Sequence, residues 1–195
     1  MHCRQVRLRT LFSSLQENFI TMKIIGGEAE FKNEYLFSYI TDSGRSSLRL
    51  ILKSMPKGKK YLLPDFLCKT IIDIFDELNL NYSFYGIKHD LSIDIKSIRN
   101  KKFDVFYLID YFGKKDKNIN YFKNSDIAII EDSVFLPVPE KPAHVKNWAG
   151  FNSFRKISAL AGGSIVKSTF NLNKLLLDKK EAPFLSMKYR AKNIK

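Results

Sequence analysis

The segment FDVFYLIDYFG, residues 103–113, contains the most apolar run of the chain and indicates its fold. Its first seven residues are typical of a buried strand, which leads at Asp110 into a loop. The segment DIAIIEDS, residues 126–133, has the same pattern, with an apolar run that stops at two acids, the second of which is Asp132. Strands that are apolar along most of their length favour a parallel sheet that is buried on both faces.

Helical and strand patterns alternate on either side of these two segments. A helix-start signal at Asp42-Ser43-Gly44 precedes apolar residues at helical spacing, and Pro56 ends that helix. The patterns also predict short strands at 61–63, 81–85, 151–154 and 163–166, and helices at 66–78, 93–98, 119–122 and 171–179. We therefore expect an α/β fold with three layers (αβα) and a mostly parallel sheet, in which ligands bind at the carboxyl ends of the strands.

Length and composition exclude several classes of protein. A chain of 195 residues, 45% of them apolar, corresponds to about one domain and can bury a core without disulfides. Cys3 and Cys68 are the only cysteines, which argues against a disulfide framework or a zinc site and favours the cytoplasm. No apolar stretch is long enough to span a membrane. Residues 1–21 are basic and precede MKIIGGEAEF, so we interpret them as a leader or a mis-called start, with the domain at 22–195.

The charge of the chain favours anionic partners. Its formal net charge is +13, which suits phosphorylated metabolites, nucleic acid or anionic lipid without distinguishing between them. Its lysines are scattered as KK and KxK pairs instead of lining one helix face, which argues against nucleic acid.

Three local features could take part in chemistry, and each also has a purely structural interpretation. SGRSSL, residues 43–48, is either a phosphate site at a helix N-terminus or an ordinary helix cap. Asp132 is either a cap or a carboxylate directed into the ligand crevice, where an opposite charge such as a protonated pyridine would keep it ionised. Lys156 is either a surface lysine or a lysine that forms a Schiff base, and Gly162-Gly163 after it either admits a flat ligand or makes a turn.

Taken together and in this order, the motifs resemble the DegT/DnrJ/EryC1/StrS family of sugar aminotransferases, which use pyridoxal 5′-phosphate (PLP). The resemblance rests on GGEAEF (26–31), SGRSSLRLIL (43–52), LLPDFLC (62–68), IDYFG (109–113), IIEDS (129–133), NSFRK (152–156) and AGGSIV (161–166).

The resemblance implies roles for particular residues. Lys156 falls on the family's Schiff-base lysine, which also moves the proton between substrate and cofactor, and Asp132 falls on the acid that pairs with the pyridine nitrogen. The phosphate would be held by Gly44, Arg45, Ser46 and Ser153. Arg45 replaces a threonine of the family. Cys68 takes the position of a ring-stacking aromatic residue, so that Phe66 could clamp the ring instead, and Phe135 replaces a glutamine or histidine.

The resemblance also implies partners. The expected reaction transfers an amino group, usually from glutamate, to a keto sugar carried on a nucleotide, and the expected assembly is a homodimer. Family members continue into a smaller C-terminal domain, so we expect this chain to correspond to an incomplete large domain. The alternative is a non-catalytic binding or assembly protein with the same fold.

Overall fold

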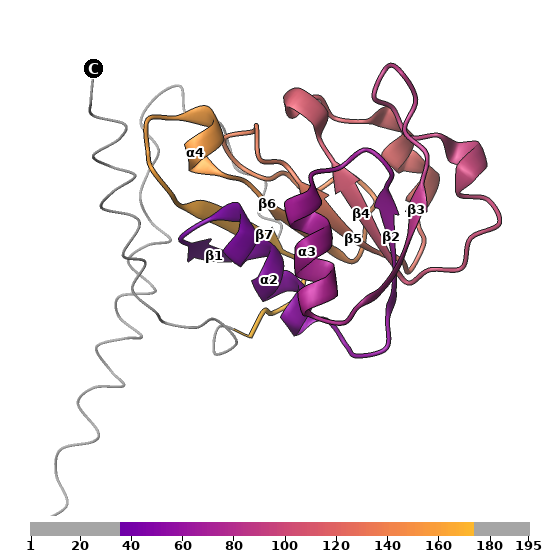
Figure 1. Ribbon diagram of the computed structural model, residues 1–195, viewed down its shortest axis with the longest axis horizontal. Coiled ribbons are helices and arrows are strands. Elements are labelled where there is room, and N and C mark those ends of the chain that lie inside the picture. Colours follow the sequence, from indigo (N-terminus) through magenta and orange to yellow (C-terminus); the bar gives the residue numbers. More distant parts are fainter. Residues whose placement is uncertain (1–35, 174–195) are drawn as a thin grey trace, which may run out of the picture. The chain divides into compact units, whose positions relative to one another are not determined.

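The computed structural model describes residues 36–173, in which helices lie against one mixed sheet (Figure 1). The expectations for residues 1–21, for GGEAEF and for 174–179 lie outside the described residues, and 171–173 are not helical. The elements are β1 (Phe37–Thr41), α2 (Gly44–Ser54), β2 (Lys60–Pro64), α3 (Lys69–Glu77), β3 (Asn81–Tyr85), β4 (Val105–Ile109), β5 (Ala128–Asp132), β6 (Trp148–Phe151), α4 (Phe154–Ile157) and β7 (Ser164–Ser168), with 3₁₀ turns at Ile95–Ser97, Tyr111–Gly113 and Lys117–Phe122.

The sheet has the strand order β1-β7-β6-β5-β4-β2-β3. The five strands from β6 to β3 are parallel, whereas β7 is antiparallel to both of its neighbours, β6 and β1. The prediction of a mostly parallel sheet in an α/β fold is therefore confirmed. Parallel strands direct their carboxyl ends to one edge, so the segments that leave β2, β4, β5 and β6 all start at that edge.

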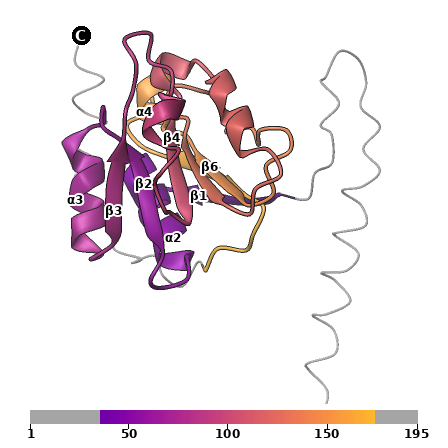
Figure 2. The ribbon, with the colours of Figure 1, turned by 90° about the vertical axis from the view of Figure 1, so that its right-hand side faces the viewer.

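The central strands β2, β4, β5 and β6 are buried on both faces of the sheet, whereas the edge strands β1 and β3 are largely exposed. Successive side chains of a strand point to opposite faces. In β4, Tyr107 packs into a core with α2 and α3, whereas Phe106 packs into a second core on the other face. Figure 2 shows α2 and α3 on one side of the sheet and the 3₁₀ turns on the other. Within residues 36–173, the layer on the second face contains 3₁₀ turns and no α-helix. The helices predicted at 93–98 and 119–122 are therefore wrong in type, and these segments form the 3₁₀ turns Ile95–Ser97 and Lys117–Phe122.

The local sequence explains where the helix α2 begins and ends. Ser43 is the N-cap of α2, and its Oγ accepts a hydrogen bond from the Ser46 amide. Leu48 and Ile51 then point into the core, and Pro56 follows directly after the C-cap Met55. The helix-start prediction is thus confirmed.

The structure also differs from the sequence predictions in its strands. The strand expected at 151–154 is β6 at Trp148–Phe151, because Ser153 caps the short helix α4 and Phe154 begins it. The edge strand β1, in which Phe37 and Ile40 are exposed, was not predicted from the sequence. Among residues 36–173, none of the helices has the length and apolar character that crossing a bilayer requires.

Candidate functional site at the carboxyl edge of the sheet

A cavity of about 740 Å³ opens at the carboxyl edge, a size typical of small-molecule sites. Six of the seven residues expected to bind or act on PLP line it, and these are Gly44, Arg45, Cys68, Asp132, Ser153 and Lys156. Ser46 does not line the cavity, and its hydroxyl lies 3.1 Å from the Ser43 hydroxyl. The other two acids that follow strands, Asp110 and Asp65, do not line the cavity. Asp110 is buried, and the Asp65 carboxylate accepts a hydrogen bond from the Ile87 amide.

The N-terminus of α2 forms one wall of the cavity. Its first amide groups, those of Gly44 and Arg45, have no acceptor within the helix and carry the positive end of its dipole. A Cβ on Gly44 would lie 3.3 Å from the Asn152 carbonyl, so the absence of a side chain lets α2 approach the segment that follows β6. Ser153, in that segment, uses its side chain for no cap bond. The two segments therefore bring backbone amides and a hydroxyl to one place, as phosphate binding requires.

A chain of buried hydroxyl groups holds this wall in place. The hydroxyls of Thr41 and Ser47 lie 2.7 Å apart, and those of Ser47 and Ser164 lie 2.6 Å apart. The Ser164 hydroxyl in turn donates to the Asn152 carbonyl at 2.5 Å. These bonds join β1, α2, β7 and the segment after β6, so the helix N-terminus and Ser153 are positioned by the same network.

Asp132, the last residue of β5, faces the cavity and is 6% exposed. Its Oδ2 accepts a hydrogen bond of 2.8 Å from the Tyr107 hydroxyl, and its Oδ1 accepts a longer one of 3.3 Å from the Val134 amide. Burial raises the pKa of Asp132 to about 6, although both bonds and the charge of Lys156 lower it. A cation close to this carboxylate would favour its ionised form.

Lys156 lies in α4, on the side of the cavity formed by the segment after β6. Its Nζ is 5.4 Å from the centroid of the Phe135 ring, within the range of a cation–π contact. The backbone of this segment is anchored by Asn152, whose amide nitrogen donates to the Pro137 carbonyl and whose Oδ1 accepts from the Ile165 amide at 2.8 Å. The amine is therefore carried on a fixed backbone while its side chain remains exposed to the cavity.

Aromatic rings form the remaining wall. Phe66, Tyr111 and Phe135 line the cavity, and the Tyr111 hydroxyl donates to the Phe66 carbonyl. Cys68 also lines it, and hydrogen bonds from Thr70, together with the charge of Lys156, lower the pKa of its thiol. The cavity thus combines aromatic rings with charged groups, which suits a planar, anionic ligand.

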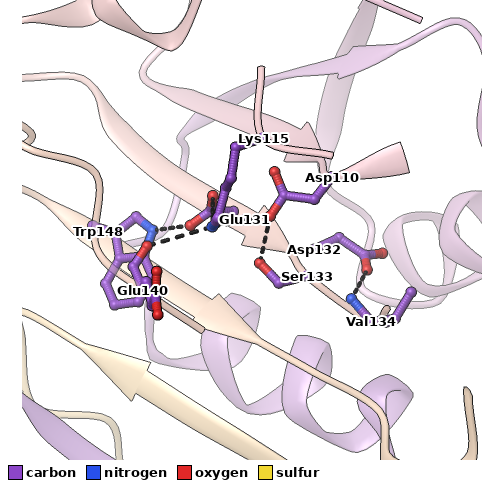
Figure 3. A network of polar contacts seen from close by, with 8 residues as sticks. All are labelled: Asp110, Lys115, Glu131, Asp132, Ser133, Val134, Glu140 and Trp148. Atoms are coloured by element: carbon purple, nitrogen blue, oxygen red, sulfur yellow. Dashed lines mark hydrogen bonds and ion pairs between the residues drawn. The ribbon is translucent and has the colours of Figure 1, made fainter. Parts of the chain in front are cut away.

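A second buried network lies behind Asp132, on the opposite face of β5 (Figure 3). The side chain of Glu131 points away from that of Asp132, accepts a 2.7 Å bond from Trp148 Nε1 and lies 2.6 Å from Lys115 Nζ. Lys115 also pairs with the buried Asp110 at 3.0 Å. Burial and the charge of Asp110 raise the pKa of Glu131, whereas Lys115 lowers it. This network fixes β5 from the side that the cavity does not reach.

Sequence reasoning missed two residues of the site, Tyr107 and Tyr111. Both were interpreted only as parts of a strand and its exit, because a tyrosine in an apolar run gives no signal of its own. Strand alternation supplies a signal once the register is known. Ile109 pairs with Asp132, so Tyr107 lies on the same face two residues earlier.

The donor set fits PLP. A phosphate can be received by the amide groups of α2, Arg45 and Ser153, and a pyridinium nitrogen by the buried carboxylate of Asp132. An aldehyde can be reached by an amine, Lys156, in the same cavity, while Phe66 and Phe135 offer surfaces for a flat ring. No metal-binding group of three or more His, Cys, Asp or Glu side chains occurs within the described range 36–173.

Comparisons with known proteins point to the same fold. No protein-family model and no curated protein sequence matches the chain. Among solved structures, Helicobacter pylori PseC, an aminotransferase involved in the biosynthesis of pseudoaminic acid, is 17% identical, with a TM-score of 0.54 over 71% of this chain and 41% of its own. The PLP form of the putative sugar aminotransferase Spr1654 from Streptococcus pneumoniae is 15% identical, with a TM-score of 0.52 over 80% of this chain and 45% of its own.

A third similar structure is a GDP-4-keto-6-deoxymannose-3-dehydratase with a trapped PLP–glutamate geminal diamine. It is 22% identical, with a TM-score of 0.54 over 66% of this chain and 39% of its own. The chain thus spans less than half the length of each of these proteins. At such identities the similarity concerns the fold. Residues 36–173 have a mixed α/β fold that resembles the large domain of PLP-dependent transferases.

Proposed function

We propose that the chain is a PLP-dependent aminotransferase that transfers an amino group from glutamate to a keto sugar carried on a nucleotide. The observation that supports this most strongly is the convergence of Lys156, Asp132, Ser153 and the α2 N-terminus on one cavity. These groups come from separate parts of the sequence, and together they match the phosphate, ring nitrogen and aldehyde of PLP.

The cofactor-binding residues in this proposal are those expected from the sequence. When bound, PLP supplies an aldehyde that condenses with amines and a pyridinium ring that withdraws electrons. Gly44, Arg45 and Ser153 bind its phosphate, and Ser46 supports them through its contact with Ser43. Asp132 accepts a hydrogen bond from the ring nitrogen and favours its protonated form.

Lys156 is the catalytic residue of the proposal. Its amine would hold the cofactor through the aldehyde and, when free, would move a proton between the substrate carbon and C4′ of the cofactor. Cys68 contributes a thiol where a flat ring would stack more strongly, so Phe66 and Phe135 supply the larger contact surfaces.

The charge of the cavity supports an anionic substrate. Three cations, Arg45, Arg155 and Lys156, line it against two carboxylates, those of Asp42 and Asp132. Among residues 36–173, neither arginine forms an ion pair, so both can bind anionic groups of a cofactor, a nucleotide sugar or an amino-acid donor.

We further propose a cytoplasmic homodimer in which residues 22–195 belong to one PLP-binding domain. The assembly is tested by sedimentation of the full chain with and without PLP, and a monomer under both conditions would contradict it.

The central test is covalent capture of PLP. The full chain is incubated with PLP, reduced with borohydride and digested, and the modified lysine is identified by mass spectrometry. We expect the label on Lys156 and its loss in Lys156→Ala, whereas the control Lys123→Ala, at an exposed lysine that does not line the cavity, keeps it. An unchanged visible absorbance in Lys156→Ala would refute the assignment.

Turnover separates this function from the alternative. A catalytic chain loaded with PLP should convert glutamate to 2-oxoglutarate and form pyridoxamine phosphate, which is measured by chromatography. A chain that takes the label at Lys156 but forms no pyridoxamine phosphate at saturating glutamate would be a non-catalytic binding or assembly protein.

A further inference from the structure

A buried tyrosine forms a hydrogen bond with Asp132, the acid that lines the cavity. Tyr107, in the middle of β4, is 0% exposed and donates its hydroxyl hydrogen to Asp132 Oδ2 at 2.8 Å. The two residues lie on the same face of adjacent strands, since Tyr107 pairs with Ile130 and Ile109 pairs with Asp132. This hydrogen bond is therefore set by the register of the sheet and not by a flexible loop.

Packing alone does not account for the hydroxyl. The ring of Tyr107 lies in the apolar core, with its centroid 6.1 Å from that of Phe75 in an edge-to-face contact. A phenylalanine would fill the same space and make the same ring contact. The oxygen adds a polar atom that is buried at a cost unless it is hydrogen-bonded, and it donates to the carboxylate that lines the cavity.

We infer that Tyr107 is the positioning residue of Asp132, holding one carboxylate oxygen so that the other is available to the ring nitrogen of the bound cofactor. The inference rests on the proposed function for its chemical purpose, whereas the bond itself does not depend on it. Oδ1 accepts only the longer 3.3 Å bond from Val134 and so retains capacity for a second donor from the cavity.

The electrostatic surroundings support this role. Four groups act on Asp132: the Tyr107 hydroxyl, the Val134 amide and Lys156 favour its charged form, and Asp110 opposes it. Burial is the largest influence, and it favours the neutral acid. Burial also raises the pKa of Tyr107 well above its ordinary value, so its hydroxyl remains a donor throughout the physiological range.

The variant Tyr107→Phe removes the donor and keeps the ring. In the cofactor-free full chain, labelled with ¹³C at the aspartate carboxyls and assigned with Asp132→Asn, we expect the titration midpoint of Asp132 to rise by about one pH unit. The dissociation constant for PLP at pH 7.5 should rise about tenfold, because a hydrogen bond to a charged group is lost. Tyr82→Phe is the control, since its hydroxyl donates to Asp76, which does not line the cavity.

The outcomes distinguish a failure of the inference about Tyr107 from a failure of the proposed function. If Tyr107→Phe only lowers the melting temperature and leaves the Asp132 midpoint and PLP affinity as in Tyr82→Phe, the tyrosine is structural and the inference is wrong. If PLP labels no lysine in the unmodified chain, the proposed function fails, while the carboxyl titration still decides whether Tyr107 controls Asp132.

A measurement on the unmodified chain does not depend on the folding of any variant. The ¹³Cζ resonance of Tyr107 should shift with pH at the same midpoint as the Asp132 carboxyl, because the Tyr107 hydroxyl donates a hydrogen bond to that carboxyl. A Tyr107 resonance that does not change through that midpoint would overturn the inference even if Tyr107→Phe cannot be purified.

Discussion

Asp132 places a negative charge where the surrounding protein disfavours it. Its pKa is raised to about 6, mainly by burial. An acid whose pKa is higher in the folded than in the unfolded chain binds more protons when folded, so its contribution to stability is greatest at low pH and is lost as the pH rises through about 6. This cost is typical of functional sites, where a group is kept for its chemistry and not for stability.

The variant Asp132→Asn tests this cost. Its advantage in free energy of unfolding over the original chain should grow by about 1.4 kcal/mol between pH 5 and pH 8, the window in which the folded carboxyl ionises. Urea denaturation of the cofactor-free protein at both values measures the effect. Asp126→Asn, at an exposed acid, is the control, and an equal pH dependence in both variants would contradict the prediction.

At the scale of residues, the structure brings two candidate residues from the sequence, Asp132 and Lys156, to one cavity. Asp132 was identified because it follows an apolar strand, and Lys156 because it lies between two apolar segments and falls on a lysine of the family that the motifs resemble. Tyr107 was not, since its role depends on which strand lies next to β4, and that pairing is a long-range property of the fold.

At the scale of elements, the placement of α4 against β7 depends on one glycine. Gly163 has a φ of +98°, and a Cβ there would lie 2.8 Å from Phe154 Cδ2. Its amide also donates to the Asp42 carbonyl at 2.5 Å, next to the N-cap of α2. The segment that carries Lys156 and the wall that would hold the phosphate are therefore joined at this residue.

Gly163→Ala should destabilise the fold and displace α4. The positive φ alone costs about 1 kcal/mol, and the clash with Phe154 raises the loss to about 2–3 kcal/mol. Gly58→Ala is a matched control, because φ there is +77° with open space around the Cβ position. Thermal denaturation and PLP titration should show larger losses of melting temperature and of PLP affinity for Gly163→Ala than for Gly58→Ala. Equal losses in the two variants would argue against a role of the Phe154 contact.

Elements were predicted best where a cap and a periodic pattern coincide, as in α2. The strand β6 begins and ends three residues earlier than predicted, because Phe154, the apolar residue at which the predicted strand ended, begins α4. The helix α4 has four residues, which is too short to show a helical period.

At the scale of the whole molecule, charge and topology act together. The chain carries a formal net charge of +13, and its cavity opens at the edge where the parallel strands end. Parallel pairing was foreseeable from the apolar strands, whereas the antiparallel edge of β7 and β1 was not, because nothing local in these short segments specifies direction.

The net charge predicts how salt affects ligand capture. Affinity for PLP should fall about three- to tenfold between roughly 0.05 M and 0.5 M sodium chloride, because screening weakens the attraction of a phosphate dianion to a basic protein. Affinity for pyridoxal, which lacks the phosphate, should change less than about twofold over the same range. Fluorescence titrations measure both, and an equal salt dependence for the two ligands would show that the phosphate is not bound by these charges.

The indole of Trp148 allows the face of β5 opposite the cavity to be monitored by fluorescence. It belongs to the only tryptophan of the chain, it is fully buried, and its Nε1–H donates to Glu131, the neighbour of Asp132. Its emission should respond when Glu131 gains a proton, and it should be quenched by energy transfer when a chromophore absorbing near 400 nm enters the cavity on the other side of the strand. Ligand binding can therefore be followed through the intrinsic fluorescence of this tryptophan, without an added dye.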